Sequence, residues 1–135
     1  MKLNSTFFEK LGFASDETAE DGFCLQLPLQ PFLLQEVGVV HTGALSTMLD
    51  TVMGATVSKQ FQAFATTIQL NLTYFDLVAK ENYVAKTIIL DHQENYVTAE
   101  GTVTDDNDSL IAKAIGTFKI KPMDSLSMDS LGLKR

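Results

Sequence analysis

The sequence predicts an α+β fold in which an antiparallel sheet of five to six strands wraps around one long central helix. One strand-like run precedes an apolar segment with helical spacing, and four more strand-like runs follow it. The four later runs are joined by short segments with turn chemistry, which favours antiparallel pairing as a meander. A sheet of that size must bury its apolar face, and one segment alone is long and apolar enough to form the covering helix.

The first strand-like run covers Phe23 to Leu29, and Pro28 places it on or near a sheet edge because proline cannot donate to the ladder. Pro31 to Val40 is expected to form a loop. The helix is predicted over Thr42–Ser58, where apolar residues recur at helical spacing: Leu45, Met48, Leu49, Val52, Met53 and Val57. The four later strands are predicted at Thr66–Phe75, Tyr83–Asp91, Tyr96–Thr104 and Leu110–Lys121.

The two ends of the chain differ in character from this middle part. Residues 1–13 predict a short helix, capped by Asn4 or Ser5. Residues 122–135 mix Ser, Asp, Met and Leu without a sustained period and begin at Pro122, which is typical of a flexible tail. We therefore expect one domain over residues 1–121, a normal size for a single core.

The charge and cysteine content exclude several classes of function. The 135 residues carry a formal net charge of −7, and no basic residue lies between Lys10 and Lys59. Nucleic-acid binding needs clustered Lys and Arg, so we expect no nucleic-acid partner. The single cysteine, Cys24, cannot form an internal disulfide, which favours the cytoplasm. No segment predicts a signal peptide or a membrane-spanning helix, so we expect no membrane association.

Asp50 is the most informative position in the sequence. It is the one charged residue within the predicted helix, and no Lys or Arg stands three or four residues away to pair with it. An unpaired carboxylate on such an apolar helix is costly to bury, and perturbed acids of this kind gather at functional sites. The alternative is a narrow solvent-facing stripe shared with Ser46 and Thr47. The pattern by itself favours neither interpretation.

The segment around Asp50 resembles a known family. Gly38 to Gly54 reads GVVHTGALSTMLDTVMG, and it is similar to the signature of the hotdog thioesterases related to phenylacetyl-CoA thioesterase. In that family His-Gly-Gly begins the helix and the acid follows nine residues after the His, as Asp50 follows His41 here. Weaker matches occur at Thr66–Phe75 and at Lys113–Phe118, so the resemblance covers about residues 21–121.

The resemblance implies a hotdog fold and hydrolysis of acyl-CoA thioesters by a homodimer or a dimer of dimers. It implies an active site across the dimer interface, with Asp50 acting as general base or as nucleophile. Thr67 matches the family's hydroxyl residue, which could orient the attacking water. Gln35 lies six residues before His41, where the family often carries an Asn that polarises the thioester carbonyl.

The start of the predicted helix suits the chemistry of a thioester. Attack by water turns the carbonyl oxygen into an oxyanion, which preorganised N–H groups stabilise strongly. A helix start leaves several N–H groups unpaired, and Thr42 and Gly43 are placed to offer theirs. Asp50 lies about two turns further along, too far to serve the same carbonyl in its own chain. A site shared between two chains would solve this.

Two residues depart from the family pattern. Thr42 stands where the family usually has Gly, and a β-branched residue is strained there if the backbone requires a positive φ. Gln35 stands where the family often has Asn, with the same amide on a longer side chain. His41 could touch the thioester, but local hydrogen bonds at the helix start are the commoner role for such a histidine.

Other candidate sites in the sequence are weaker. The two histidines, His41 and His92, have no metal-ligand spacing, so we predict no metal, and we expect no cofactor. We expect His92 in a solvated turn, and Cys24 as a small packed residue of a strand. The acidic group Asp105, Asp106 and Asp108 lacks the rest of a calcium loop and predicts a solvated hairpin turn.

Binding of coenzyme A would need local positive charge and room for the acyl group. Lys80 and Lys113 are the candidates for contacts to the CoA phosphates, although each is also an ordinary surface lysine by its pattern. The acyl group is expected between helix and sheet, near a set of flexible or aromatic side chains that equally suit a simple core: Met48, Met53, Phe61 and Phe64.

The sequence therefore predicts an acyl-CoA thioesterase, with two alternatives. A non-catalytic acyl-CoA-binding dimer would explain the changes at Thr42 and Gln35. The other alternative is a hotdog hydratase or dehydratase, in which His41 and an acidic residue would act on the acyl chain. The sequence does not choose between CoA and an acyl-carrier protein, although its acidic charge fits an acidic carrier less well.

Overall fold

The computed structural model describes residues 12–16 and 24–123. Most of the predicted N-terminal helix and nearly all of the predicted tail lie outside the described residues. The described elements are β1 (Ala14–Asp16), β2 (Cys24–Pro28), the 3-10 turn η1 (Pro31–Leu33), β3 (Leu34–Glu36), β4 (Val39–Val40), α2 (Thr42–Phe61), β5 (Ala63–Tyr74), β6 (Asn82–Gln93), β7 (Tyr96–Thr104) and β8 (Leu110–Pro122).

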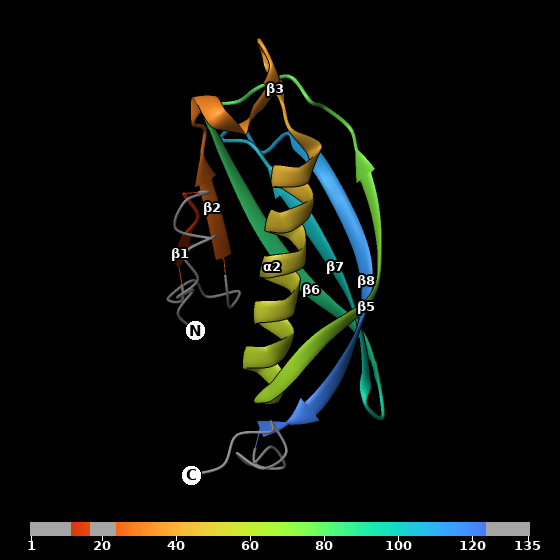
Figure 1. Cartoon of the computed structure of the whole chain (residues 1–135). Helices are drawn as coiled ribbons and strands as arrows, with labels where there is room; N and C mark the ends of the chain where they lie inside the picture. Colours follow the sequence, from red (N-terminus) through yellow and green to blue (C-terminus); the bar gives the residue numbers. More distant parts are fainter. Residues whose placement is uncertain (1–11, 17–23, 124–135) are drawn as a thin grey trace.

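The predicted α+β architecture is confirmed. One sheet of six strands has the order β1-β2-β6-β7-β8-β5, with every neighbouring pair antiparallel. Figure 1 shows α2 lying lengthwise against one face of this sheet, which curls around the helix. A small two-stranded hairpin of β3 and β4 sits beside the start of α2. Within the described ranges, no helix combines the length and apolar character needed to cross a membrane.

The predicted meander is only partly right. Strands β6, β7 and β8 pair in sequence order, but β5 pairs with β8 and not with β6. The free side of β6 is taken by β2, so β5 joins the sheet at its far edge. The connection from β5 to β6 is held at the helix start, where Val78 bridges to Val39 and Ala79 N–H donates to Gly38 O at 2.8 Å.

One prediction near the N-terminus was confirmed and one was wrong in detail. Strand β2 lies near the sheet edge as predicted, with β1 outside it, pairing from Ala14–Gln26 to Asp16–Cys24. The segment predicted as a loop, Pro31 to Val40, contains η1 and the β3–β4 hairpin. Gly38 has φ +79, a conformation open to glycine at little cost, and it lets the hairpin turn between the strands.

Helix α2 begins at Thr42 as predicted and continues to Phe61, three residues beyond the predicted end. Gln62 then takes the left-handed conformation (φ 48) and its N–H bonds Ser58 O, which closes the last turn. The apolar residues of the predicted pattern are all fully buried against the sheet: Leu45, Met48, Leu49, Val52, Met53 and Val57. Burying each such side chain contributes roughly 1.5–3 kcal/mol to folding.

Tyr83 on β6 ties the core to the chain segment before it. Its side chain is fully buried, and its hydroxyl oxygen accepts a hydrogen bond from Lys80 N–H at 2.9 Å. Burial raises the pKa of the Tyr83 phenol, although the Lys80 N–H acts in the opposite direction. A phenol whose pKa is raised by folding costs stability when the solution becomes alkaline.

We expect the free energy of unfolding of Tyr83→Phe to fall less at high pH than that of the wild type. At neutral pH the variant should lose about 1 kcal/mol, because Lys80 N–H loses its acceptor. Between pH 8 and a pH above the ordinary tyrosine value, the wild type should lose stability that the variant keeps. Urea unfolding of both proteins at the two pH values checks this. Parallel losses in both proteins would contradict a raised pKa at Tyr83.

Candidate active site

His41 is the N-cap of α2, and its side chain bonds to the helix it precedes. Its backbone is extended (φ −71, ψ 127), and Nδ1 accepts a hydrogen bond from Gly43 N–H at 2.9 Å. The main-chain N–H of His41 donates to Leu33 O at 2.8 Å, which fixes the helix start to η1. The structure thus shows the local hydrogen bond expected for His41. It also occupies the Gly43 amide that the sequence offered as an oxyanion donor.

The Thr42 amide is the donor that remains available. Its N–H donates to no other residue in the described part of the chain. Neither Thr42 nor Gly43 has a positive φ, so a β-branched residue is accommodated at position 42 without backbone strain. Position 43 does need glycine, because a Cβ there would lie 2.9 Å from His41 Nδ1. The structure therefore favours Thr42 over Gly43 as the donor to a carbonyl oxygen.

Asp50 lies half-buried on the side of α2 that faces β5. Thr67 Oγ1 on β5 donates a hydrogen bond to Asp50 Oδ1 at 2.7 Å. This joins the helix acid to the hydroxyl residue that the family resemblance singled out. Among the described residues, no lysine or arginine forms an ion pair with Asp50. The carboxylate is held by one hydrogen bond and keeps its second oxygen for another partner.

A β-bulge in β5 sets the direction of Thr67. The register with β8 runs from Thr67–Phe118 to Gln69–Thr117, so Ile68 is an extra residue on β5. Because of the bulge, both Thr67 and Leu70 face the helix. No glycine or proline marks this position, and sequence reasoning missed it.

The two groups predicted to act on a thioester carbonyl lie far apart within one chain. Thr42 and Asp50 are eight residues apart on α2, a rise of about 12 Å along the axis. The predicted separation is therefore present in the structure.

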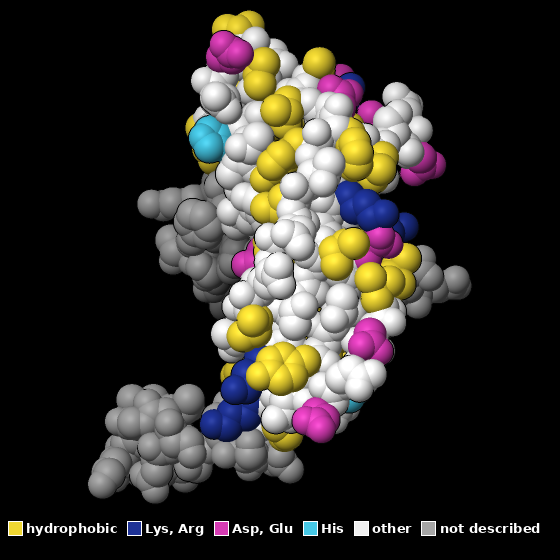
Figure 2. Space-filling view, turned by 90° about the vertical axis from the view of Figure 1, so that its right-hand side faces the viewer, with side chains coloured by type: hydrophobic (Ala, Val, Ile, Leu, Met, Phe, Trp, Pro, Cys, Tyr) yellow, Lys and Arg dark blue, Asp and Glu magenta, His cyan; other side chains and the backbone are white. Residues whose placement is uncertain are grey.

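Strand β5 is an edge of the sheet and carries exposed apolar side chains. It pairs with β8 on one side, and no strand of the described chain lies on its other side. The exposed fractions are 48% for Phe64, 54% for Ile68 and 55% for Phe75, which follows the strand directly. Figure 2 looks onto this side of the molecule, and apolar side chains gather on it from one end to the other. An open edge of this kind invites pairing with another strand.

The other sequence candidates lie apart from Asp50 in the fold. Gln35 is exposed on β3, next to the strand that leads into His41. His92 is exposed at the end of β6, where Nε2 lies 2.9 Å from Glu94 O and the ring contacts Phe61. Cys24 is buried in β2, as a packed strand residue should be. Within the described ranges, no group of three His, Cys, Asp or Glu residues could hold a metal ion.

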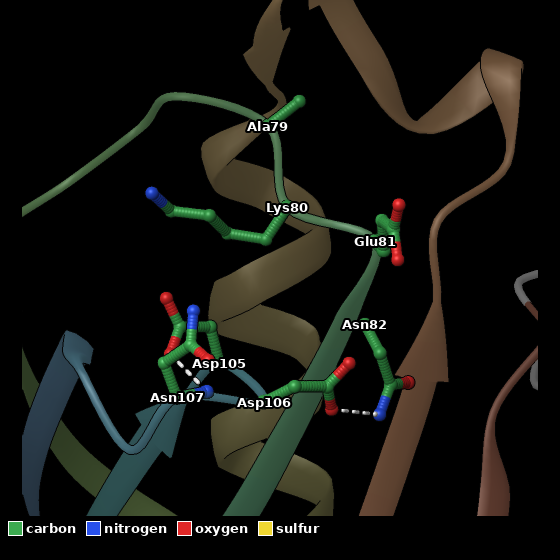
Figure 3. A pocket seen from close by; sticks show the side chains of 7 residues that line it. All are labelled: Ala79, Lys80, Glu81, Asn82, Asp105, Asp106 and Asn107. Carbon is green, nitrogen blue, oxygen red and sulfur yellow. Dashed lines mark hydrogen bonds between the residues drawn. The ribbon is translucent and has the colours of Figure 1, made fainter.

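A pocket of about 360 Å³ lies where the start of β6 meets the turn between β7 and β8 (Figure 3). Its lining residues are mostly polar and acidic: Ala79, Lys80, Glu81, Asn82, Asp105, Asp106 and Asn107. As predicted, the acidic segment forms a hairpin turn, and Asp106 and Asp108 are exposed. Asp105 differs from the prediction because it is buried, and its Oδ1 accepts hydrogen bonds from Asn107 N–H and Ser109 N–H, both at 2.9 Å.

Both lysines predicted to bind CoA phosphates are already paired with carboxylates. Lys80 Nζ lies 2.9 Å from Asp76 Oδ2. The side-chain hydrogen bond between them raises the pKa of Lys80 and lowers that of Asp76. Lys113 Nζ lies 2.6 Å from Glu100 Oε1 on the neighbouring strand. A role with phosphate stays a prediction for both lysines and would require each to exchange its partner.

The structure separates the four side chains expected to surround the acyl group. Met48 and Met53 are fully buried between α2 and the sheet. Phe61 is partly buried at the end of α2, and Phe64 is exposed on β5, beside Ala63 and Ala65, which face the core. Only the two methionines therefore lie between helix and sheet as expected.

The family model of the thioesterase superfamily matches residues 37–112, more than half of the chain. The chain belongs to the thioesterase superfamily. The matched range contains His41, Asp50 and Thr67, and it leaves out Gln35. No curated protein sequence matches this chain.

Several solved structures are similar to this hotdog fold. A Bacillus halodurans protein, crystallised with CoA, is 27% identical, with a TM-score of 0.81 over 90% of this chain and 82% of its own. A conserved Pseudomonas aeruginosa protein is 26% identical, with a TM-score of 0.77 over 87% of this chain and 94% of its own. A Haemophilus influenzae thioesterase is 15% identical, with a TM-score of 0.81 over 89% of this chain and 85% of its own, which shows the fold alone.

We expect Thr67→Val to weaken the link between β5 and α2. Valine keeps the shape of threonine but cannot donate to Asp50, so unfolding should cost roughly 0.5–1.5 kcal/mol less. Thr66→Val is the matched control, since Thr66 is exposed and faces away from the helix. In an Asp50→Ala background the cost of Thr67→Val should largely disappear, as a urea double-mutant cycle would show. An unchanged cost in that background would mean that the hydrogen bond adds no stability.

Proposed function

We propose that this protein hydrolyses acyl-CoA thioesters to a free acid and CoA. The observation that carries the proposal is the Asp50 carboxylate on α2, which accepts a hydrogen bond from Thr67 on β5. The same helix begins with a free amide at Thr42, and the chain belongs to the thioesterase superfamily. The Bacillus halodurans protein with CoA supports the choice of the carrier.

In the proposed reaction the thioester carbonyl oxygen accepts a hydrogen bond from Thr42 N–H. Asp50 takes a proton from a water molecule, and the water oxygen forms a bond to the carbonyl carbon. Negative charge moves to the carbonyl oxygen, where the Thr42 amide and the positive end of the helix dipole stabilise it. The C–S bond then breaks, and the CoA sulfur leaves with the proton from Asp50. In the nucleophilic alternative, Asp50 itself attacks and gives an anhydride that water hydrolyses.

Thr67 acts on the carboxylate in this scheme. Its hydroxyl donates to Asp50 Oδ1, so Oδ2 is the oxygen left to receive the proton of the water. Fixing the carboxylate in one orientation keeps the base aimed at the same point through the reaction. This differs from the sequence expectation, in which Thr67 holds the water itself.

The proposal includes a homodimer that pairs β5 of one protomer with β5 of its partner. The edge strand is open, its exposed apolar residues would be covered, and Asp50 lies beside it on α2. Placing the Thr42 amide of one protomer near Asp50 of its partner would overcome the separation of about 12 Å within each chain.

Thiol release from short, long and aromatic acyl-CoAs is the direct test of the activity. We expect turnover by the wild type and a loss of a hundredfold or more in Asp50→Asn, because the amide cannot take a proton. Binding of substrate should survive in the variant. Asp91→Asn, at an exposed position on β6, controls for the loss of one charge. A folded dimer without turnover on any acyl-CoA would overturn the proposal.

A mixing experiment tests whether the site is shared between protomers. Thr42→Pro removes the amide at the first helical position, where proline is well tolerated and His41 already has the extended conformation it requires. We expect Thr42→Pro and Asp50→Asn each to be inactive alone. An equal mixture of the two, refolded together, should recover about a quarter of wild-type activity, since half of the dimers then hold one intact site.

The control for this experiment is Thr42→Ala, which keeps the N–H and should stay active. A mixture that remains inactive, although heterodimers form, would place both groups in one chain's site and contradict the shared arrangement.

A non-catalytic acyl-CoA-binding dimer is the second candidate. The observation that favours it is the Gly43 amide, which is taken by His41 and leaves one donor for the carbonyl. The same thiol-release assay separates the two, because a binding dimer would hold acyl-CoA without releasing thiol.

A further inference from the structure

Four small residues form a hollow in the helix-facing side of the sheet. Ala99 and Gly101 on β7 lie opposite Gly116 and Ala114 on β8, and all four are buried. We call these four residues the small-residue floor. Larger side chains frame it on the outer strands, Leu70 and Leu72 on β5 and Thr87 and Ile89 on β6. Glycine inside a strand weakens the sheet, and it often marks a place where another group comes close.

The group that fills the hollow is the side chain of Met53. A Cβ on Gly101 would lie 2.7 Å from Met53 Sδ and 2.8 Å from its Cγ. A Cβ on Gly116 would lie 3.2 Å from Met53 Cε. The thioether therefore lies against both glycines, from β7 to β8. Leu49 contacts the Gly101 end of the floor and Leu70 the Gly116 end, at 3.0 and 2.9 Å from the Cβ positions, and Met53 is the side chain that reaches both. Met53 is unbranched and can change its rotamer at low cost.

Met53 also adjoins the proposed catalytic acid. It stands three residues after Asp50 on α2, within one turn of the helix. On the sheet side, Gly116 is two residues from Phe118, the register partner of Thr67, a distance of about 7 Å along the strand. The floor, with the Met53 side chain against it, therefore lies close to Asp50 and Thr67.

The far end of this space has an unsatisfied polar atom. Thr87 lies opposite Gly101 on β6, and its Oγ1 is buried with no hydrogen-bond partner in the described part of the chain. A buried hydroxyl without a partner costs free energy, so this end of the floor is not optimised for stability alone.

We propose that Met53 is the residue that limits the length of the acyl group. In this inference, which rests on the proposed function, a short acyl chain enters beside Asp50 and ends against the Met53 side chain. Longer chains must displace Met53 from the small-residue floor and lose its packing there. The protein is thus a hydrolase of short straight-chain acyl-CoAs. The small-residue floor is the place where a longer acyl chain would lie once Met53 had moved.

The test compares kcat/KM on a series of straight-chain acyl-CoAs of increasing length. Met53→Ala removes about three chain atoms from the hollow. We expect the ratio of long-chain to short-chain kcat/KM to rise by about tenfold or more, because each methylene in an apolar pocket carries discrimination of that order. Met53→Val, which leaves a smaller cavity, should shift the ratio in the same direction and covers the case in which the alanine variant unfolds.

Two further variants separate this role from ordinary core packing. Met48→Ala removes the same atoms from an equally buried position on α2. No Met48 atom is among the nearest neighbours of the Cβ positions at Gly101 and Gly116. It should leave the length preference unchanged. Gly101→Ala in the Met53→Ala background adds a methyl group to the emptied floor, and it should return the preference toward short chains.

Equal shifts in Met53→Ala and Met48→Ala, or no shift in either, would overturn the inference. Binding of free straight-chain fatty acids, measured by calorimetry, provides a readout that needs no turnover. If the wild type hydrolyses no acyl-CoA, the proposed function fails. Tighter binding of long acids by Met53→Ala than by Met48→Ala would then still support Met53 as the residue that limits chain length, and equal binding would reject that role.

Discussion

The burial of one apolar helix against one curled sheet is the constraint on which the rest of the structure depends. Helix α2 is the single long helix of the described chain, and its apolar residues fill the concave side of the sheet. The sheet must curl to surround a single cylinder, so its strands end at an open edge and not in a closed barrel. The side of α2 nearest that edge is where a polar residue can lie without entering the core. Asp50 occupies this position, and Thr67 on the edge strand meets it.

The same constraint explains why the two chemical groups of the site are separated. A helix start offers unpaired amides at its end, while an acid tolerated on an apolar helix must lie on its flank. Here these are Thr42 at the end and Asp50 about two turns along the flank. A second protomer paired along the open edge would bring the helix start of one chain near the Asp50 side of the helix in the other chain. Oligomerisation would then be part of the chemistry as well as a cover for exposed apolar surface.

Local details of the site depend on small backbone features. His41 caps the helix through Gly43, which leaves the Thr42 amide as the free donor. The bulge at Ile68 lets Thr67 and Leu70 both face the helix, so the strand serves the site and the core together. Glycines at 101 and 116 allow a flexible methionine to lie against the sheet within one helical turn of the acid. Each feature sets the position of a side chain at or beside the candidate site.

The sequence by itself determined the elements and the spacing of the motif. Apolar periodicity located α2 and the four strands after it, because burial of one face is a local pattern that survives in one dimension. The nine-residue step from His41 to Asp50, which the resembled family shares, singled out Asp50 as the candidate acid and placed it after the helix start. Only the tertiary structure decided that β5 pairs with β8, that Thr67 bonds Asp50, and that His41 occupies the Gly43 amide. Strand order, a bulge and a hydrogen bond between distant residues arise from long-range packing, and such pairings leave no periodic signal along the chain.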